Sequence, residues 1–202
     1  MTLLSIVYVS CKKDDSSDDN NAPNPTPTNT SFSYIKQGAS WTYINSDTDP
    51  NHAGITFESS YTITAMDADG WCNVNFVLPS FTQPMQWFAD NSLWSDMANK
   101  ASNMKFPLIK ATPVLNDEYT MNYDDNGTTV TNTRKVIDLK DTVVVTAGAF
   151  TNCVVIHETT TADSLYYKDY WIDPSAGIVR TEGTTKEDLP TIIITELKSK
   201  TP

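Results

Sequence analysis

The sequence predicts a mainly β domain: an antiparallel open barrel, curved sheet or sandwich of about ten short strands, with little helix. Apolar and polar residues alternate with a period of two along much of the chain after residue 32, and turn signals separate these runs. Threonine, which favours strands, is abundant. Hydrophobic residues make up 39% of the 202 residues, which is enough for a core. Only 7 glycines occur, which excludes collagen-like and glycine-repeat structures.

The first strands have the clearest patterns. Residues 55–65 alternate apolar side chains with threonine, serine and glutamate, as in a strand with one face in water. The sequence Asp-Ala-Asp-Gly at 67–70 predicts a turn. The next strand, 71–78, places every second apolar residue on one face. Asp90-Asn91 then predicts a turn between strands at 85–89 and 92–95.

The second half of the chain is expected to form hairpins. Asn126-Gly127 is a strong hairpin signal between strands at 118–124 and 128–138. Further strands are expected at 142–146, 152–160, 165–172, 177–183 and 191–198. Residues 95–105 are the best helical or irregular candidate, because three apolar residues recur there at helical spacing.

The composition limits the function. With 25 acidic and 14 basic residues, the net charge is −11, which argues against nucleic acid as a partner because phosphate binding needs a basic face. The chain has two histidines and three cysteines, so we expect no cofactor, no metal and no catalytic residues. A calcium-loop template matches at Asp47, Asp49, Asn51 and Glu58, but the position that requires glycine is His52.

The N-terminal segment predicts export. Residues 1–10 are uncharged and mostly apolar, too short to span a bilayer, and fit a signal peptide. No Lys or Arg precedes this apolar run, so we expect the true start to lie upstream. Tyr8-Val9-Ser10-Cys11 resembles a bacterial lipobox, in which the cysteine becomes the lipidated N-terminus. Lys13-Asp14-Asp15 resembles the surface-export signal of Bacteroidetes-type lipoproteins. Residues 11–31 then form a disordered tether rich in Asp, Pro and Thr, and 32–202 form the β domain.

Three segments of the domain resemble a group of small Bacteroidetes-type lipoproteins. They are residues 34–43, with a Gly-Ala-Ser-Trp-Thr-Tyr sequence, 145–156 with Ala-Gly-Ala-Phe, and 170–180 with Tyr-Trp followed by Gly-Ile-Val. The resemblance implies a curved antiparallel sheet like the open half-barrel of LolA-like carriers, in which a helix on the concave side is an option. The resemblance implies a cellular location and a fold, but no particular biochemical activity.

The sequence gives little support for a catalytic site. Cys153 and His157 share a strand face but lie about 13 Å apart, too far for direct activation. No feature singles out a carboxylate pair, so a glycoside hydrolase is the least favoured function. Cys72 and Cys153 can form a disulfide after export or remain buried free thiols.

Aromatic residues are the remaining candidates for ligand binding. Trp87 and Trp94 flank one predicted hairpin, while Tyr170 and Trp171 point to opposite faces of one strand. Such rings can line a groove for lipid or sugar, although they more often belong to a core.

We therefore expect an outer-membrane lipoprotein of non-enzymatic binding type, facing the cell surface or alternatively the periplasm. Its membrane contact is the lipid on Cys11, and its ligand is an apolar small molecule or a glycan. The alternative is a structural or accessory subunit of a surface protein complex. An open concave apolar pocket would favour a carrier, an exposed aromatic row would favour a glycan binder, and a filled core would favour the accessory role.

Overall fold

The computed structural model describes residues 32–49, 51, 54–184 and 191–201. The predicted signal peptide, lipidated Cys11, the export signal Lys13-Asp14-Asp15 and the tether lie outside these residues. Within the described part the chain forms fourteen strands and no helix, so no helix there is long or apolar enough to cross a membrane.

The strands follow one another in the order β1 Ser40–Asp47, β2 Thr56–Met66, β3 Trp71–Leu78, β4 Phe81–Ala89, β5 Leu93–Ser95, β6 Met97–Asn99, β7 Met104–Phe106, β8 Ile109–Lys110, β9 Glu118–Asp125, β10 Thr128–Val145, β11 Gly148–Thr160, β12 Asp163–Asp173, β13 Gly177–Thr184 and β14 Ile192–Thr201.

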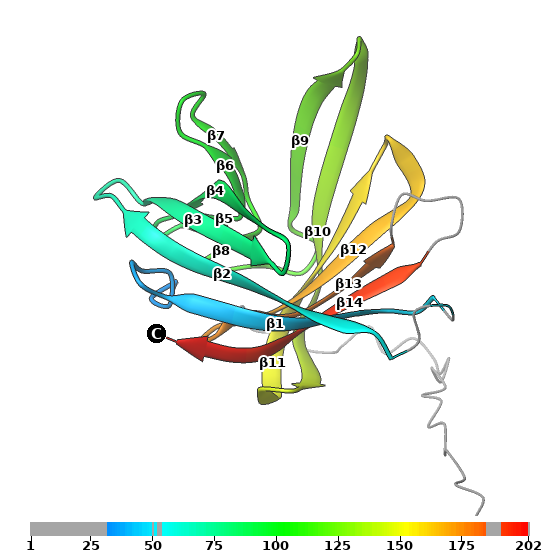
Figure 1. The fold of residues 1–202 in the computed structure, drawn as a ribbon. Helices are drawn as coiled ribbons and strands as arrows, with labels where there is room; N and C mark the ends of the chain where they lie inside the picture. Colours follow the sequence, from blue (N-terminus) through cyan, green and yellow to red (C-terminus); the bar gives the residue numbers. More distant parts are fainter. Residues whose placement is uncertain (1–31, 50, 52–53, 185–190, 202) are drawn as a thin grey trace, which may run out of the picture.

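Twelve of these strands form one antiparallel sheet in the order β8-β5-β4-β3-β2-β1-β14-β13-β12-β11-β10-β9, and β6 pairs with β7 in a separate hairpin. The sheet curves so that its two halves face each other across a concave side, with β9 and β10 rising opposite β4 to β7 (Figure 1). It is not closed into a barrel, because the edge strands β8 and β9 do not pair with each other.

The register shows which side chains share the concave face, because residues directly opposite each other in an antiparallel pair point to the same side. Tyr61 is opposite Phe76 on β3, and Tyr170 is opposite Thr181 on β13. On β10, Arg134 is opposite Glu158 of β11. Alternate residues of the whole sheet therefore line one continuous concave surface.

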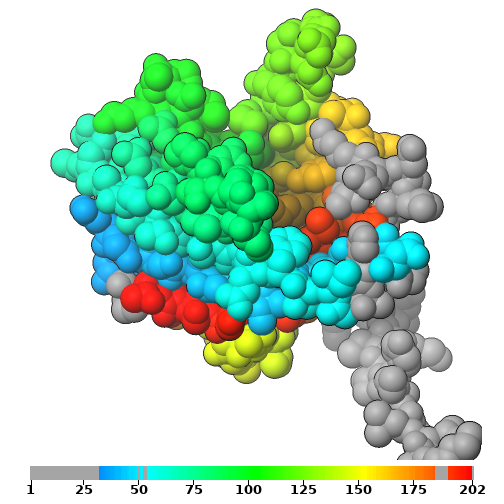
Figure 2. All heavy atoms as spheres, in the orientation of Figure 1, coloured from blue at the N-terminus to red at the C-terminus, as the bar shows by residue number. Residues whose placement is uncertain are grey.

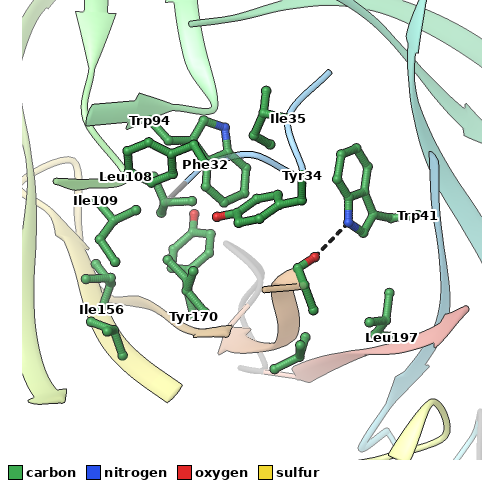
Figure 3. Close-up of a cluster of buried hydrophobic side chains, with 14 of the residues drawn as sticks. Phe32, Tyr34, Ile35, Trp41, Trp94, Leu108, Ile109, Ile156, Tyr170 and Leu197 are labelled. Carbon is green, nitrogen blue, oxygen red and sulfur yellow. Dashed lines mark hydrogen bonds between the residues drawn. The ribbon is translucent and has the colours of Figure 1, made fainter. Parts of the chain in front are cut away.

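A buried core fills one end of the concave side. The segment just before β1 folds inward, so that the Tyr34 ring packs edge-to-face against Trp41 and Trp94 (Figure 3). The indole Nε1 of Trp41 donates a 2.8 Å hydrogen bond to the carbonyl of Ala176. Gly177 takes a φ of +85°, and a Cβ there would lie 3.0 Å from the Tyr34 ring, so this approach requires glycine.

The predicted fold class is confirmed, and the main errors concern two segments. The weak helical candidate at residues 95–105 is wrong: this segment contains β6 and most of β7. The strands predicted at 128–138 and 142–146 form one strand, β10, whose irregular register near Asp138 and Asp141 accommodates the polar residues. No described residue forms the optional concave helix.

Candidate functional site

A cavity of about 200 Å³ lies on the concave face beside the filled core. Five aromatic residues line it: Tyr43, Tyr61, Phe76 and Trp87 from β1 to β4, and Tyr170 from β12 on the facing half of the sheet. Space-filling atoms show a hollow between β4–β7 and the β9–β10 hairpin, with orange residues of β12 and β13 visible inside it (Figure 2). The cavity therefore lies between the two halves of one curved sheet.

The aromatic wall is built by packing between neighbouring strands. Tyr61 stacks on Phe76 with ring centroids 4.7 Å apart, and Trp87 packs against Tyr61 at 5.4 Å. Tyr43 approaches Tyr61 edge-on at 5.9 Å, and its hydroxyl donates to the carbonyl of Ile178 at 3.0 Å. Burial raises the pKa of Tyr61, with a smaller contribution from the charge of Asp96. The wall therefore consists of neutral rings in fixed orientations.

Part of the polar lining is satisfied internally. The Asn45 amide donates to the Ser59 hydroxyl at 2.9 Å, and the Thr195 hydroxyl donates to the Asn45 side-chain oxygen at 2.8 Å. Trp87 differs, because its Nε1 is buried and has no hydrogen-bond partner among the described residues. An unpaired buried donor costs free energy.

A buried charge cluster borders the cavity. Arg134 of β10 is fully buried, and its Nε lies 2.5 Å from Glu158 Oε2. Its Nη1 lies 2.7 Å from Asp96 Oδ1, and 3.3 Å from the carbonyls of Phe106 and Pro107. Although burial lowers the pKa of Arg134, the charge of Asp96 and the other neighbours raise it overall, so the guanidinium stays charged.

Glu158 is held by the same cluster. Its Oε1 accepts a hydrogen bond from the Tyr166 hydroxyl and its Oε2 accepts one from the Tyr170 hydroxyl, both at 3.0 Å. Burial raises the pKa of Glu158, but the charge and hydrogen bond of Arg134 outweigh it and lower the pKa. Glu158 is therefore an ionised carboxylate whose oxygens are already occupied.

Lys168 is the second cation at the cavity. It lies on β12, opposite Glu158 in the register, and is half-buried in the cavity wall. Its Nζ lies 4.9 Å from the centroid of the Tyr170 ring. Burial lowers the pKa of Lys168, while the charges of Asp96 and Glu158 oppose that shift.

The structure brings together two of the four aromatic residues singled out in the sequence. Trp87 and Tyr170 line the cavity. Trp94 is buried in the core behind it and packs against Trp87 with centroids 5.5 Å apart. Trp171 does not line it, and its indole donates to Asp141 Oδ2 at 2.6 Å.

Sequence reasoning missed Tyr43, Tyr61, Phe76 and Lys168 as lining residues. The alternation in 55–65 and 71–78 gave a signal for two of them, because Tyr61 and Phe76 are on the apolar positions of those strands. Which of these positions meet across the sheet depends on the register.

The described cysteines and His157 do not form the disulfide, catalytic pair or metal site that were considered from the sequence. Cys72 and Cys153 are both buried free thiols, so the disulfide considered from sequence is absent from the structure. They belong to β3 and β11, which lie in opposite halves of the sheet. His157 Nδ1 lies 2.6 Å from Asp169 Oδ1 on the neighbouring strand. Among the described residues, no group of three His, Cys, Asp or Glu is placed to hold a metal.

Comparison with known proteins gives two similar solved structures. One is a candidate lipoprotein from Parabacteroides distasonis, with a TM-score of 0.48 and 16% identity, over 87% of this chain and 99% of the other. The second is a candidate exported protein with a YmcC-like fold from Bacteroides fragilis, with a TM-score of 0.46 and 15% identity, over 88% of this chain and 99% of the other. No model of a protein family matches the chain. No curated protein matches it.

Proposed function

We propose that the chain is a non-enzymatic binding protein that holds a small apolar ligand in the concave cavity. The observation that carries this proposal is a space of about 200 Å³ between a wall of four aromatic rings from β1 to β4 and the Tyr170 ring on the facing half of the sheet. Apolar cavities of about 150 Å³ already hold a benzene-sized guest. The space here suits a single substituted ring or a short alkyl chain, whose burial against these rings supplies the binding free energy.

An apolar ligand fits this geometry better than a glycan does. Trp87 and Tyr170 are each only 4% exposed, so their faces do not form the open platform on which a sugar ring stacks. Tyr61 and Phe76 stack on each other, which occupies part of their surface. The cavity therefore offers ring edges and enclosed space rather than a flat exposed row.

The chemistry of the lining supports binding rather than catalysis. The two carboxyl groups nearest the cavity, those of Asp96 and Glu158, are both paired with Arg134. His157 pairs with Asp169 and is not among the lining residues. Both described cysteines are buried, and burial raises the pKa of the Cys72 thiol to about 11. None of these groups is placed as an activated nucleophile facing the cavity.

The proposed setting is an outer-membrane lipoprotein anchored through Cys11, with Lys13, Asp14 and Asp15 directing it to the cell surface. Residues 12–31 would reach at most ~70 Å when fully extended, enough to hold the domain clear of the membrane. Membrane fractionation tests the anchor: Cys11→Ala should move the protein to the soluble fraction. Protease added to whole cells tests the orientation, since an intact domain would indicate the periplasm-facing alternative.

Binding is tested by isothermal titration calorimetry of 1-octanol with the full chain carrying Cys11→Ala, without detergent. A ligand of about ten non-hydrogen atoms that gains about 0.6 kcal/mol per atom would bind with a Kd of about 40 μM. Thr181→Phe places a ring in the cavity and should weaken binding at least tenfold. Thr56→Phe, on the exposed opposite face of β2, is the matched control and should bind as the parent does. Saturable binding that Thr181→Phe leaves unchanged would place the probe elsewhere, and no binding would favour the accessory role.

A further inference from the structure

We propose that Lys168 binds an acidic head group, so that the ligand is a small apolar molecule ending in a carboxylate. This inference rests on the proposed binding function and adds the chemical class of the ligand. It identifies one end of the cavity as polar and the aromatic wall as the site of the apolar tail.

The ammonium of Lys168 is placed to receive such a group. It lies in the cavity wall, above the Tyr170 ring, and it forms no hydrogen bond or ion pair with another described residue. An ammonium carries three N–H donors, and leaving them unpaired away from water is costly. The contact with Tyr170 supplies a cation–π attraction but no acceptor. A ligand oxygen would satisfy donors that the fold leaves open.

The neighbouring carboxylates do not take this role. Glu158 is opposite Lys168 in the register, but its oxygens receive Arg134, Tyr166 and Tyr170. Asp96 lines the cavity, and its Oδ1 receives the Arg134 guanidinium at 2.7 Å. Arg134 is thus engaged by both acids, while Lys168 is engaged by neither.

The four charges also leave room for an anion. Two cations, Arg134 and Lys168, balance two carboxylates, Asp96 and Glu158, so the cluster has no net negative charge to repel a ligand acid. Burial lowers the pKa of Lys168, and a bound carboxylate would raise it again by favouring the charged form. Binding of an acid should therefore be coupled to the protonation of this side chain.

The aromatic wall opposite Lys168 determines that the rest of the ligand is an apolar tail. Tyr61, Phe76 and Trp87 lie on β2, β3 and β4, on the half of the sheet that faces β12. A molecule with its head at Lys168 would direct its tail toward these rings. Octanoate and 1-octanol are matched probes, because they share chain length and differ chiefly in charge.

The experiment measures the binding of octanoate and of 1-octanol to the full chain carrying Cys11→Ala by isothermal titration calorimetry. At neutral pH, octanoate should bind at least tenfold more tightly than 1-octanol. Lys168→Met keeps an apolar stem but removes the charge, and should weaken octanoate at least tenfold while leaving 1-octanol within about twofold. Lys168→Arg should keep the preference for the acid. Lys140→Met, at an exposed position on β10, is the matched control and should change neither ligand.

The outcomes separate the two proposals. If neither probe binds, the binding function itself is wrong. If both probes bind equally well, or if Lys168→Met leaves octanoate unaffected, the cavity binds apolar ligands but Lys168 does not recognise an acid. The comparison of octanoate with 1-octanol needs no variant at Lys168, so it decides the question even if Lys168→Met does not fold.

Discussion

The guanidinium of Arg134 lies 2.7 Å from the carboxylate of Asp96 and joins two distant parts of the sheet. Asp96 sits between β5 and β6, close to one edge, whereas Arg134 is on β10, next to the opposite edge strand β9. The same guanidinium also donates to the carbonyls of Phe106 and Pro107. A side chain thus connects the two halves of a sheet whose edge strands form no backbone pairing with each other.

Replacing this arginine should destabilise the fold strongly. Arg134→Met leaves Glu158 and Asp96 without their partner in a buried site, and breaking a buried ion pair in this way costs about 3–5 kcal/mol. Urea unfolding at pH 7 measures the loss. Arg180→Met is the control, because its pairs with Glu182 and Glu196 are partly exposed and should contribute about 1 kcal/mol or less. A loss below about 1 kcal/mol at Arg134 would contradict the bridging role.

The Glu158 carboxylate should make stability depend on acid pH. Its pKa in the fold is below the ordinary value of 4.5, so the unfolded chain binds more protons in this range. The stabilisation is therefore complete above pH 4.5 and is lost as pH falls through the folded pKa. Unfolding curves between pH 6 and pH 2 should show a shallower decline for Glu158→Gln than for the parent. Glu118→Gln, at an exposed position, should leave the slope unchanged.

Gly70 should not tolerate a side chain. Its φ is +90°, and a Cβ there would lie 2.3 Å from the carbonyl oxygen of Ala89, which is backbone that cannot rotate away. Gly127 also has a positive φ, +86°, but it has open space around it. We expect Gly127→Ala to cost about 1 kcal/mol and Gly70→Ala to cost clearly more, measured by thermal unfolding. Equal losses would mean that the turn before β3 shifts freely.

The two buried thiols should resist labelling in the folded protein. Burial, with the nearby charge of Asp67, raises the pKa of Cys72 to about 11. Burial, with Asp173 and Asp141, raises the pKa of Cys153 to about 12. At pH 8, an aromatic disulfide reagent should therefore modify neither thiol until the chain unfolds, and then modify both without prior reduction. A mass shift of two protons on reduction would instead reveal a disulfide.

Local patterns predicted most strands of this fold, and the errors have physical causes. Alternation defined residues 71–78, and Asn126-Gly127 defined the β9–β10 hairpin. Residues 138–141 contain charged side chains that are typical of a turn, yet in β10 they occupy register irregularities within one long strand. The spacing of Met97 and Met104 fitted a helix, but both residues belong to the short β6–β7 hairpin.

The candidate site was less predictable because it depends on pairings between remote segments. Trp87 and Tyr170 were singled out as aromatic candidates, but their meeting across the cavity follows from the curvature of the whole sheet. Lys168 shows no unusual local pattern. Its position becomes informative only once Glu158 and Asp96 are seen to be paired with Arg134 instead.

The most direct test of the binding site is the indole ¹⁵N–¹H spectrum of the full chain carrying Cys11→Ala during titration with 1-octanol. The chain has five tryptophans, and Trp87→Phe and Trp171→Phe identify two of the signals. Trp87 lines the cavity and has an unpaired Nε1, whereas Trp171 is bonded to Asp141 outside it. We expect a saturable shift of the Trp87 signal while the Trp171 signal stays in place. A Trp87 signal that does not move at saturating 1-octanol would contradict ligand binding in the concave cavity.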